Sequence, residues 1–220
     1  DKYSHVILDE QGTRLNGFFA AGECACVSVH GGNRLGTNSL LDAVVFGERA
    51  GKSVLDYALN IDYADVNEGQ EKARVLKKIE DVFQRDGSEC YEDIRNEMKK
   101  IMMSHCGVFR DEEKLKVCIE TLKDLQERYK KGKVTDKGKL FNTEIYEIIE
   151  LGNMLSMAQV IAFAALHRQE SRGGHFRTDF PKRDDEKFLH HSMVYGSPDG
   201  MIVKKKPVVI TKHQPAERTY

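Results

Sequence analysis

The four prolines of this chain all lie near its C-terminal end, at Pro181, Pro198, Pro207 and Pro215. Proline has no backbone N–H and clashes with the preceding helical turn, so it is excluded from helix interiors. The chain before Pro181 is therefore free to be mostly helical, and the segment after it is not. This change in composition is the strongest internal boundary.

The composition is typical of a soluble globular protein. Charged residues make up 31%, hydrophobic residues make up 40%, and the net charge is -1. A nearly balanced charge gives no attraction to nucleic acid or an anionic membrane, so we expect no nucleic-acid partner. The longest apolar region, 151–166, contains Asn153, Ser156 and Gln159, which predicts a buried helix rather than a membrane span.

The beginning of the chain and its cysteines bear on what kind of product it is. The chain starts at Asp1 without a signal-like apolar stretch, so we expect a fragment or a processed product. Its five cysteines include Cys24 and Cys26 with one residue between them, a spacing that suits neither a zinc knuckle nor a redox pair. We expect buried, reduced thiols. The adjacent His190 and His191 diverge on any element, so no metal site is predicted.

The N-terminal part is predicted to contain two strands and a helix. Short apolar runs at 6–8 and 17–21 are separated by turn residues, which indicates strands. A helix is predicted to begin near Ser39, where Ser39 and Asp42 form an S-x-x-D capping box. We expect this helix to be mostly buried. Its apolar residues are Leu40, Leu41, Val44, Val45, Val54, Leu55 and Ala58.

Amphipathic helices are predicted from about Asp65 to Lys131, because apolar residues recur there every three or four positions. A long helix from about Asn142 to Arg168 is apolar on nearly all sides, so we expect it to join this bundle to the Ser39 helix. Short strands and irregular structure are predicted at 188–195, 201–203 and 207–211. The bundle stripes are Leu76, Ile79 and Phe83; Tyr91, Ile94, Met98, Ile101 and Met102; and Leu115, Cys118, Leu122, Leu125 and Tyr129.

The loop 30–37 before the Ser39 helix carries the most distinctive chemistry. Gly31 and Gly36 have the spacing of a phosphate-binding loop, but Thr37 replaces the required lysine, so an ATP site is rejected. The chain has no G-x-G-x-x-G, so a complete dinucleotide-binding unit is absent. Arg34 offers a planar cation that pairs bidentately with a carboxylate, beside amides with partial positive charge at the helix start. By spacing alone, an ordinary turn with a surface arginine remains an alternative.

Two segments resemble the flavoprotein subunit of succinate dehydrogenase and fumarate reductase. Residues 17–58, beginning GFFAAGECACVSVHGGNRLGTNSLLDAVVFG, are similar to the segment that closes its FAD domain. Residues 170–175, with 179–181 and 183–185, resemble its C-terminal signature, and the ending 218–220 also fits. The first motif is specific to this family and its near relatives, whereas the helical part is the least distinctive.

The resemblance implies a mainly α fold in three parts. Residues 1–60 would be the C-terminal remnant of an α/β FAD-binding domain. Residues 61–168 would form a helical, three-helix bundle, and residues 169–220 a small mixed tail with short strands. The loop 172–175 is expected to tie this tail to the FAD domain through hydrogen bonds. The chain would then be the C-terminal part of a longer subunit.

The resemblance also assigns site residues. Glu23 would bind FAD through a ribose hydroxyl, and Ser39 and Leu40 would contact the isoalloxazine through backbone amides. Arg34 would hold a carboxylate of succinate or fumarate. No catalytic residue and no metal ligand is assigned, because the family's covalent FAD histidine, glycine-rich turn and proton-shuttling arginine lie in earlier segments. We therefore expect the chain alone to be inactive.

The implied activity is FAD-dependent oxidation of succinate to fumarate, or the reverse, with electrons passing to an iron-sulfur subunit. The membrane anchor would be contacted only indirectly, and the subunit would lie on the cytoplasmic face of the inner membrane, or on the matrix side in a mitochondrion. Two alternatives remain open. One is a flavoprotein like L-aspartate oxidase, and the other is a non-catalytic docking module for an iron-sulfur partner.

Overall fold

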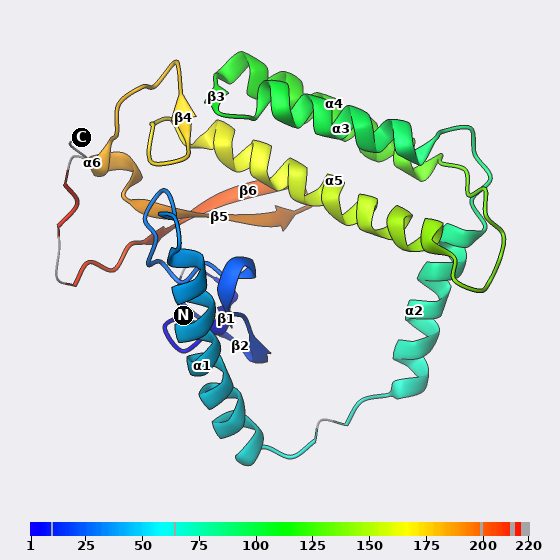
Figure 1. Ribbon diagram of the computed structural model, residues 1–220, viewed down its shortest axis with the longest axis horizontal. Coiled ribbons are helices and arrows are strands. Elements are labelled where there is room, and N and C mark those ends of the chain that lie inside the picture. The colour runs from blue at the N-terminus through cyan, green and yellow to red at the C-terminus, as the bar shows by residue number, and fades with distance from the viewer. Residues whose placement is uncertain (10, 64, 199, 212–213, 217–220) are drawn as a thin grey trace. The chain divides into compact units, whose positions relative to one another are not determined.

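The computed structural model describes residues 1–9, 11–63, 65–198, 200–211 and 214–216. The chain divides into two compact units, whose elements are labelled in Figure 1. The first unit combines Asp1–Ile61 with Glu170–Gly174 and Lys182–Tyr220. The second combines Asp62–Gln169 with His175–Pro181. Residues far apart in the sequence therefore share the first unit.

The first unit begins with the predicted pair of strands. Strands β1 (His5–Ile7) and β2 (Arg14–Phe19) are antiparallel, with His5 opposite Phe19. The second strand starts earlier than its apolar run suggested, because Arg14 already pairs with Ile7 of β1. A short 3-10 turn, η1 (Gly22–Cys24), follows.

Helix α1 (Asn38–Leu59) starts where predicted, but the expected capping box is wrong. Thr37 is the residue before the helix, in the left-handed region with φ of 66°, and its side chain makes no capping hydrogen bond. Ser39 lies inside the first turn, so its hydroxyl is not at the capping position. The Asp42 carboxylate is instead 2.8 Å from the His30 Nε2.

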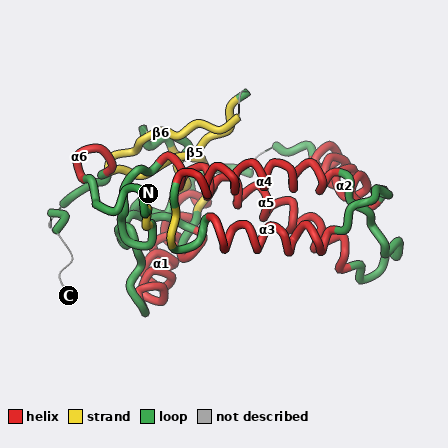
Figure 2. Tube along the Cα trace, turned by 90° about the horizontal axis from the view of Figure 1, so that it is seen from above, coloured by secondary structure: helices red, strands yellow, loops and turns green. Residues whose placement is uncertain are grey.

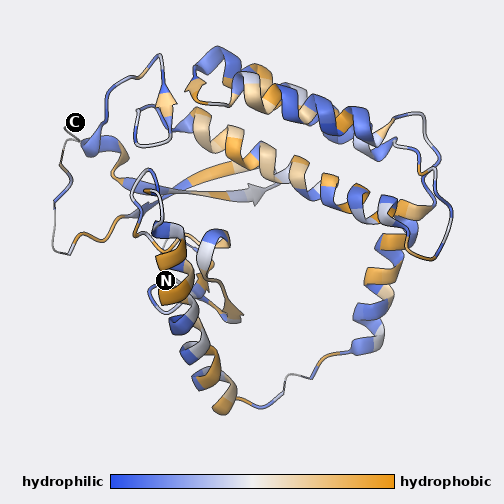
Figure 3. Cartoon of the chain, viewed as in Figure 1, coloured by the Kyte–Doolittle hydropathy of each residue, from blue (hydrophilic) through white to orange (hydrophobic). Residues whose placement is uncertain are grey.

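The expectation that α1 is mostly buried is also wrong for this chain. Only Asp42 and Phe46 are buried on the helix, and Figure 3 shows hydrophobic turns along it. The described residues of the first unit cover only that side, so the apolar remainder is solvent-exposed. The exposed apolar residues include Leu40, Leu41, Val44, Val45, Val54, Leu55 and Ala58.

The C-terminal part of the first unit is a short helix and a hairpin. Helix α6 (Asp185–Phe188) begins after Asp184, whose carboxylate accepts hydrogen bonds from two helix amides. The predicted strand therefore starts only after this helix. Strands β5 (His190–Ser197) and β6 (Gly200–Pro207) are antiparallel. The third predicted strand, 207–211, does not form beyond its first residue, which ends β6.

The second unit is helical, as the apolar stripes predicted. It contains α2 (Glu68–Phe83), α3 (Tyr91–His105), α4 (Glu112–Lys130) and α5 (Thr143–His167). Helices α3, α4 and α5 each contact the other two, and α2 contacts α5. Figure 2 shows the three running side by side. The fully buried core side chains include Ile94, Leu115, Cys118, Leu122, Leu125, Leu151 and Leu155.

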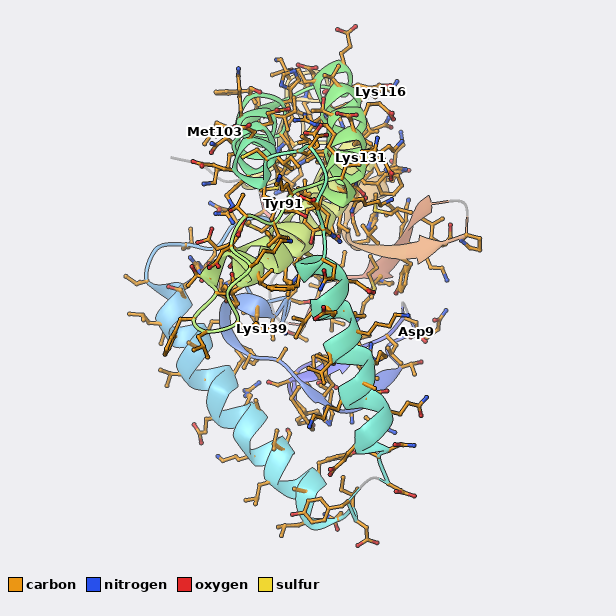
Figure 4. The ribbon with its side chains drawn as sticks, turned by 90° about the vertical axis from the view of Figure 1, so that its right-hand side faces the viewer. Asp9, Tyr91, Met103, Lys116, Lys131 and Lys139 are labelled. Atoms are coloured by element: carbon orange, nitrogen blue, oxygen red, sulfur yellow. The ribbon has the colours of Figure 1, made fainter. Side chains whose placement is uncertain are left out.

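Polar side chains fix the ends of these helices. Asn67, Asp111 and Asn142 each accept a hydrogen bond from an amide of the first turn of α2, α4 and α5, as N-cap residues do. The turns before α3 and after α4 meet, because the Glu89 amide donates to the Lys131 carbonyl at 3.1 Å. Tyr91 and Lys131 mark this region in Figure 4. Caps therefore mark the starts of α2, α4 and α5, and the backbone contact joins the turn before α3 to the turn after α4.

Two further features complete the second unit. Strands β3 (Phe109–Arg110) and β4 (Phe176–Arg177) form a short parallel pair. The fully buried Arg177 side chain donates to the Ala165 and Leu166 carbonyls at the end of α5. It also pairs with Asp179 at 2.7 Å. This arginine therefore fastens the segment after α5 to the bundle.

Helix α5 is, among the described residues, the one helix long and apolar enough to cross a membrane by length and composition. The same test is passed by the core helix of a soluble protein. Its residues Ile148, Leu151 and Leu155 are almost completely buried, in contact with the other bundle helices. Core packing therefore accounts for its apolar face.

The expectation of buried thiols holds for only part of the set. Cys106 and Cys118 are buried in the second unit, whereas Cys24, Cys26 and Cys90 are exposed. All five are free thiols. The three exposed cysteines lie in loops and turns, outside the apolar stripes whose side chains pack into the core.

Candidate functional site

The candidate site lies in the first unit, in the loop between η1 and α1. Arg34 is exposed, and its side chain makes no hydrogen bond or ion pair with a described residue. A guanidinium always carries its charge, and here its donors are free to pair with an external carboxylate. The arrangement therefore suits an anionic ligand.

Glu23 lies next to this loop, on the turn η1. Its carboxylate is exposed and has no partner among the described residues. The turn packs on the beginning of α1, because a Cβ added to Gly22 would lie 3.8 Å from the Ala43 Cα. Glu23 is therefore held in the same local structure as the helix start, with its oxygens free to accept hydrogen bonds.

The two amides predicted to meet a flavin differ in the structure. The Leu40 amide donates to the Thr37 carbonyl at 3.0 Å. The Ser39 amide makes no hydrogen bond with a described residue outside α1. Because the Thr37 side chain does not cap this helix, the Ser39 amide can donate to a ligand at the positive end of the helix dipole.

One side of the loop 30–37, the Arg34 loop, is fixed to α1 by a hydrogen bond between His30 and Asp42 that was not predicted from the sequence. The His30 Nε2 is 2.8 Å from one carboxylate oxygen of Asp42. Asp42 is only 6% exposed, and its other oxygen is buried without a partner. A carboxylate within an apolar helical stretch was the signal that could have indicated this pair, since such a group needs a partner when buried.

The other side of the loop lies directly against the segment after α5. The Gly174 amide donates to the Gly32 carbonyl at 3.0 Å. Gly173 has a left-handed φ of 59°, and a Cβ there would collide with the Gly32 carbonyl. A Cβ on Gly32 would lie 2.8 Å from the Arg172 side chain. Two backbone segments therefore touch with no side chain between them.

A buried ion-pair network supports this second segment. Arg172 donates to both oxygens of Glu170, at 2.7 and 2.9 Å, and to Asp185 at 2.6 Å. Glu170 is completely buried and also accepts from the Asp184 amide. The hydrogen bond from Arg172 holds the pKa of Asp185 below its usual range. The network thus holds the segment whose Gly174 amide is hydrogen-bonded to Gly32, and the tie between the tail and a FAD domain stays a prediction.

His175, which ends the predicted tie, belongs to the second unit instead. Its Nε2 donates to the Arg168 carbonyl at 2.9 Å, and its Nδ1 accepts from Arg110 at 2.8 Å. Burial, together with the nearby arginines, lowers the pKa of His175. Among the described residues, no group of three or more His, Cys, Asp or Glu side chains could hold a metal ion.

Two protein families match this chain. Residues 95–220 match the family described as "Fumarate reductase flavoprotein C-term". Residues 1–40 match the "FAD binding domain" family, and this match contains Glu23, Arg34, Ser39 and Leu40. The candidate site therefore lies within the flavin-binding part of the match.

Similar proteins carry the corresponding names. The fumarate reductase flavoprotein subunit of Haemophilus influenzae is 39% identical over 210 residues, which cover 94% of this chain and 35% of the relative. The succinate dehydrogenase flavoprotein subunit of Coxiella burnetii is 39% identical over 220 residues, which cover 97% of this chain and 37% of the relative.

A solved structure of FrdA from E. coli quinol fumarate reductase superposes with a TM-score of 0.88 at 38% identity. The match covers 96% of this chain and 37% of that one. This chain thus spans little more than a third of the length of the relatives it matches. It belongs to the flavoprotein family of fumarate reductase and succinate dehydrogenase.

Proposed function

We propose that the whole subunit containing this chain uses FAD to oxidise succinate to fumarate, or catalyses the reverse reaction. Arg34 is the observation that carries the proposal. It is an exposed guanidinium without a partner among the described residues, in a loop fixed from two sides, within a segment that matches a FAD-binding family. A charge-assisted hydrogen bond of this kind contributes about 1.5–3 kcal/mol.

The residues of this chain fit the flavin that the family implies. Glu23 has free carboxylate oxygens that suit ribose hydroxyls, and the uncapped start of α1 offers the Ser39 amide to an electron-rich ring edge. Leu40 would contribute mainly apolar contact, since its amide donates to Thr37. FAD supplies the hydride acceptor when bound. Arg34 then binds and orients a substrate carboxylate near it.

This proposal gives each of three parts of the chain its own role. Residues 1–60 would complete the FAD-binding domain, residues 61–168 would form the helical bundle domain, and residues 169–220 would be the tail that braces the site. No residue of this chain is assigned a catalytic proton transfer, so the 220-residue chain should not turn over substrate by itself.

The partners and location are proposed by the same reasoning. The names of similar proteins include quinol fumarate reductase and 8-methylmenaquinol:fumarate reductase, which implies electron exchange with a quinone. An iron-sulfur subunit would carry the electrons, and any membrane anchor would be reached only through it. The subunit would lie peripherally on the cytoplasmic face of the inner membrane, or on the matrix side in a mitochondrion.

The test is turnover by the whole subunit with an artificial electron acceptor. We expect oxidation of succinate and no oxidation of L-aspartate. Turnover of L-aspartate alone would instead identify an L-aspartate oxidase-like enzyme. A subunit that retains FAD but oxidises neither compound, and does not reduce fumarate, would contradict the proposal and leave a non-catalytic docking role.

A further inference from the structure

We infer that Arg172, held by Glu170, is a positioning residue for Arg34. The inference rests on the proposed role of Arg34 in binding a dicarboxylate. Arg172 does not need to touch the ligand. Its position fixes the backbone against which the Arg34 loop lies.

The backbones of residues 32–33 and 172–174 are in direct contact. Gly32 is two residues before Arg34, and its carbonyl accepts from the Gly174 amide at 3.0 Å. A Cβ on Gly173 would lie 2.7 Å from the Asn33 nitrogen. At Gly173 the two backbones approach each other directly, so a shift of residues 172–174 moves residues 32–33 with it.

Residues 172–174 are anchored by the pair of Glu170 and Arg172. Glu170 is fully buried, and Arg172 pairs with both of its oxygens. The planar guanidinium fixes the relative orientation of the two side chains, which a lysine cannot do. Asp185 holds the same Arg172 nitrogen from the exposed side, at 2.6 Å. The anchor therefore defines both the position and the direction of the segment.

Arg172 itself connects the Glu170 anchor to the Arg34 loop. The Gly32 Cα lies so close to Arg172 that an added Cβ would be 2.9 Å from the Arg172 carbonyl oxygen. The Arg172 backbone thus supports the loop while its side chain is fixed to Glu170. With His30 and Asp42 on the other side, the Arg34 loop is braced from two directions. A bidentate contact with a carboxylate needs this degree of preorganisation.

The test is a double-mutant cycle in the whole, FAD-loaded subunit. Arg34→Lys, Arg172→Lys and the double variant are assayed for succinate oxidation with an artificial acceptor. We expect Arg172→Lys to lower kcat/KM about ten-fold, mostly through KM, with FAD content and reduction by dithionite unchanged. In the Arg34→Lys background the same change should cost less than about two-fold, because the two residues act through one contact.

Two further variants control the measurement. Glu170→Gln should reproduce the rise in KM, whereas Glu186→Gln, an exposed carboxylate with no side-chain partner among the described residues, should not. If Arg172→Lys fails to fold, Asp185→Asn weakens the same anchor from its exposed side and should raise KM in the same direction.

The outcomes separate this inference from the proposed function. If Arg34→Lys leaves KM unchanged, the proposed role of Arg34 fails. If Arg34→Lys raises KM but Arg172→Lys does not, or if the two effects simply multiply, the positioning role is wrong and the proposed function stands.

Discussion

The side chain of Arg34 is available to a ligand because its neighbours are fixed by other contacts. His30 pairs with Asp42, and Gly32 lies against Gly174, so the loop needs no internal bond from Arg34 to hold its shape. The sequence indicated the arginine and its Gly-rich loop. It could indicate at most that Asp42, a carboxylate in an apolar stretch, needs a partner, because the residues that come close to the loop are set only by folding.

The His30 and Asp42 pair predicts a loss of stability when one partner is removed. His30→Ala leaves a buried carboxylate with no described partner, which should destabilise the whole subunit by about 1–3 kcal/mol. His30→Gln, which keeps a donor, should cost less. Thermal or chemical unfolding checks both variants. Equal stability of His30→Ala and the parent would contradict this account of the loop.

His175 predicts how stability depends on pH. Its Nδ1 accepts from Arg110 and its Nε2 donates to Arg168, so the folded state holds it neutral and its pKa lies below 6.5. As the pH falls through 6.5, the unfolded chain takes up a proton that the folded chain does not. Stability is therefore lost below this pH, by at most about 1.4 kcal/mol per pH unit.

Denaturant unfolding at pH 7.5 and 5.5 measures this loss. His175→Gln should reduce the difference between the two pH values, while His167→Gln, at an exposed histidine on α5, serves as the control. If His175→Gln and His167→Gln have the same effect on the pH dependence, His175 is not the group responsible.

At the scale of elements, helix α5 is where the apolar pattern was most informative. The prediction of a long helix after Asn142 is confirmed, and Asn142 caps it. The amphipathic stripes of α3 and α4 also predicted their buried faces. Helical periodicity is read locally along the chain, so these elements could be predicted from the sequence.

Helix α1 shows why the rest could not be predicted. Its sequence has the composition of a buried helix, yet Leu40, Leu41 and Val44 are exposed. Composition predicts that a face will be covered but does not say which segment covers it. The short strands were less well placed than the helices, since the unpredicted helix α6 contains Phe188, the first residue of the strand expected at 188–195, and β5 begins only at His190.

The bundle core predicts large effects from small substitutions. Leu155 on α5 is completely buried, so Leu155→Ala should cost about 2–5 kcal/mol through lost burial and the cavity it leaves. Val117→Ala on α4 is the control, because Val117 is 51% exposed and should change stability by less than about 0.5 kcal/mol. Denaturant unfolding with far-UV circular dichroism checks both. Similar losses at the two sites would contradict the assigned core.

The bundle also predicts which thiols react. Burial raises the pKa of Cys118 to about 11 and also raises the pKa of Cys106. Because the thiolate is the reactive form, both should resist iodoacetamide at pH 8 in the folded chain. Cys90, the exposed thiol of the second unit, should be alkylated before either of them. Mass spectrometry of the labelled peptides tests the order, which would be contradicted by labelling of Cys118 without unfolding.

At the scale of the whole molecule, this chain corresponds to only part of the longer proteins that it matches. It covers 35% to 37% of the relatives that it matches, and α1 carries an apolar face that its own unit leaves open. In the proposed site, Arg34 would bind a carboxylate and Glu23, Ser39 and Leu40 would contact the flavin, but no residue of this chain is assigned a proton transfer. The proposed activity therefore belongs to the whole subunit.

The most direct test of the central claim is dicarboxylate binding seen through the flavin. The FAD-loaded whole subunit is titrated with fumarate, and the change in visible flavin absorbance gives a Kd. Arg34→Gln is compared with Arg49→Gln, which removes the same charge from an exposed position on α1. We predict that Arg34→Gln weakens binding by about 10- to 100-fold and that Arg49→Gln does not. A Kd for Arg34→Gln equal to that of the parent would contradict the account.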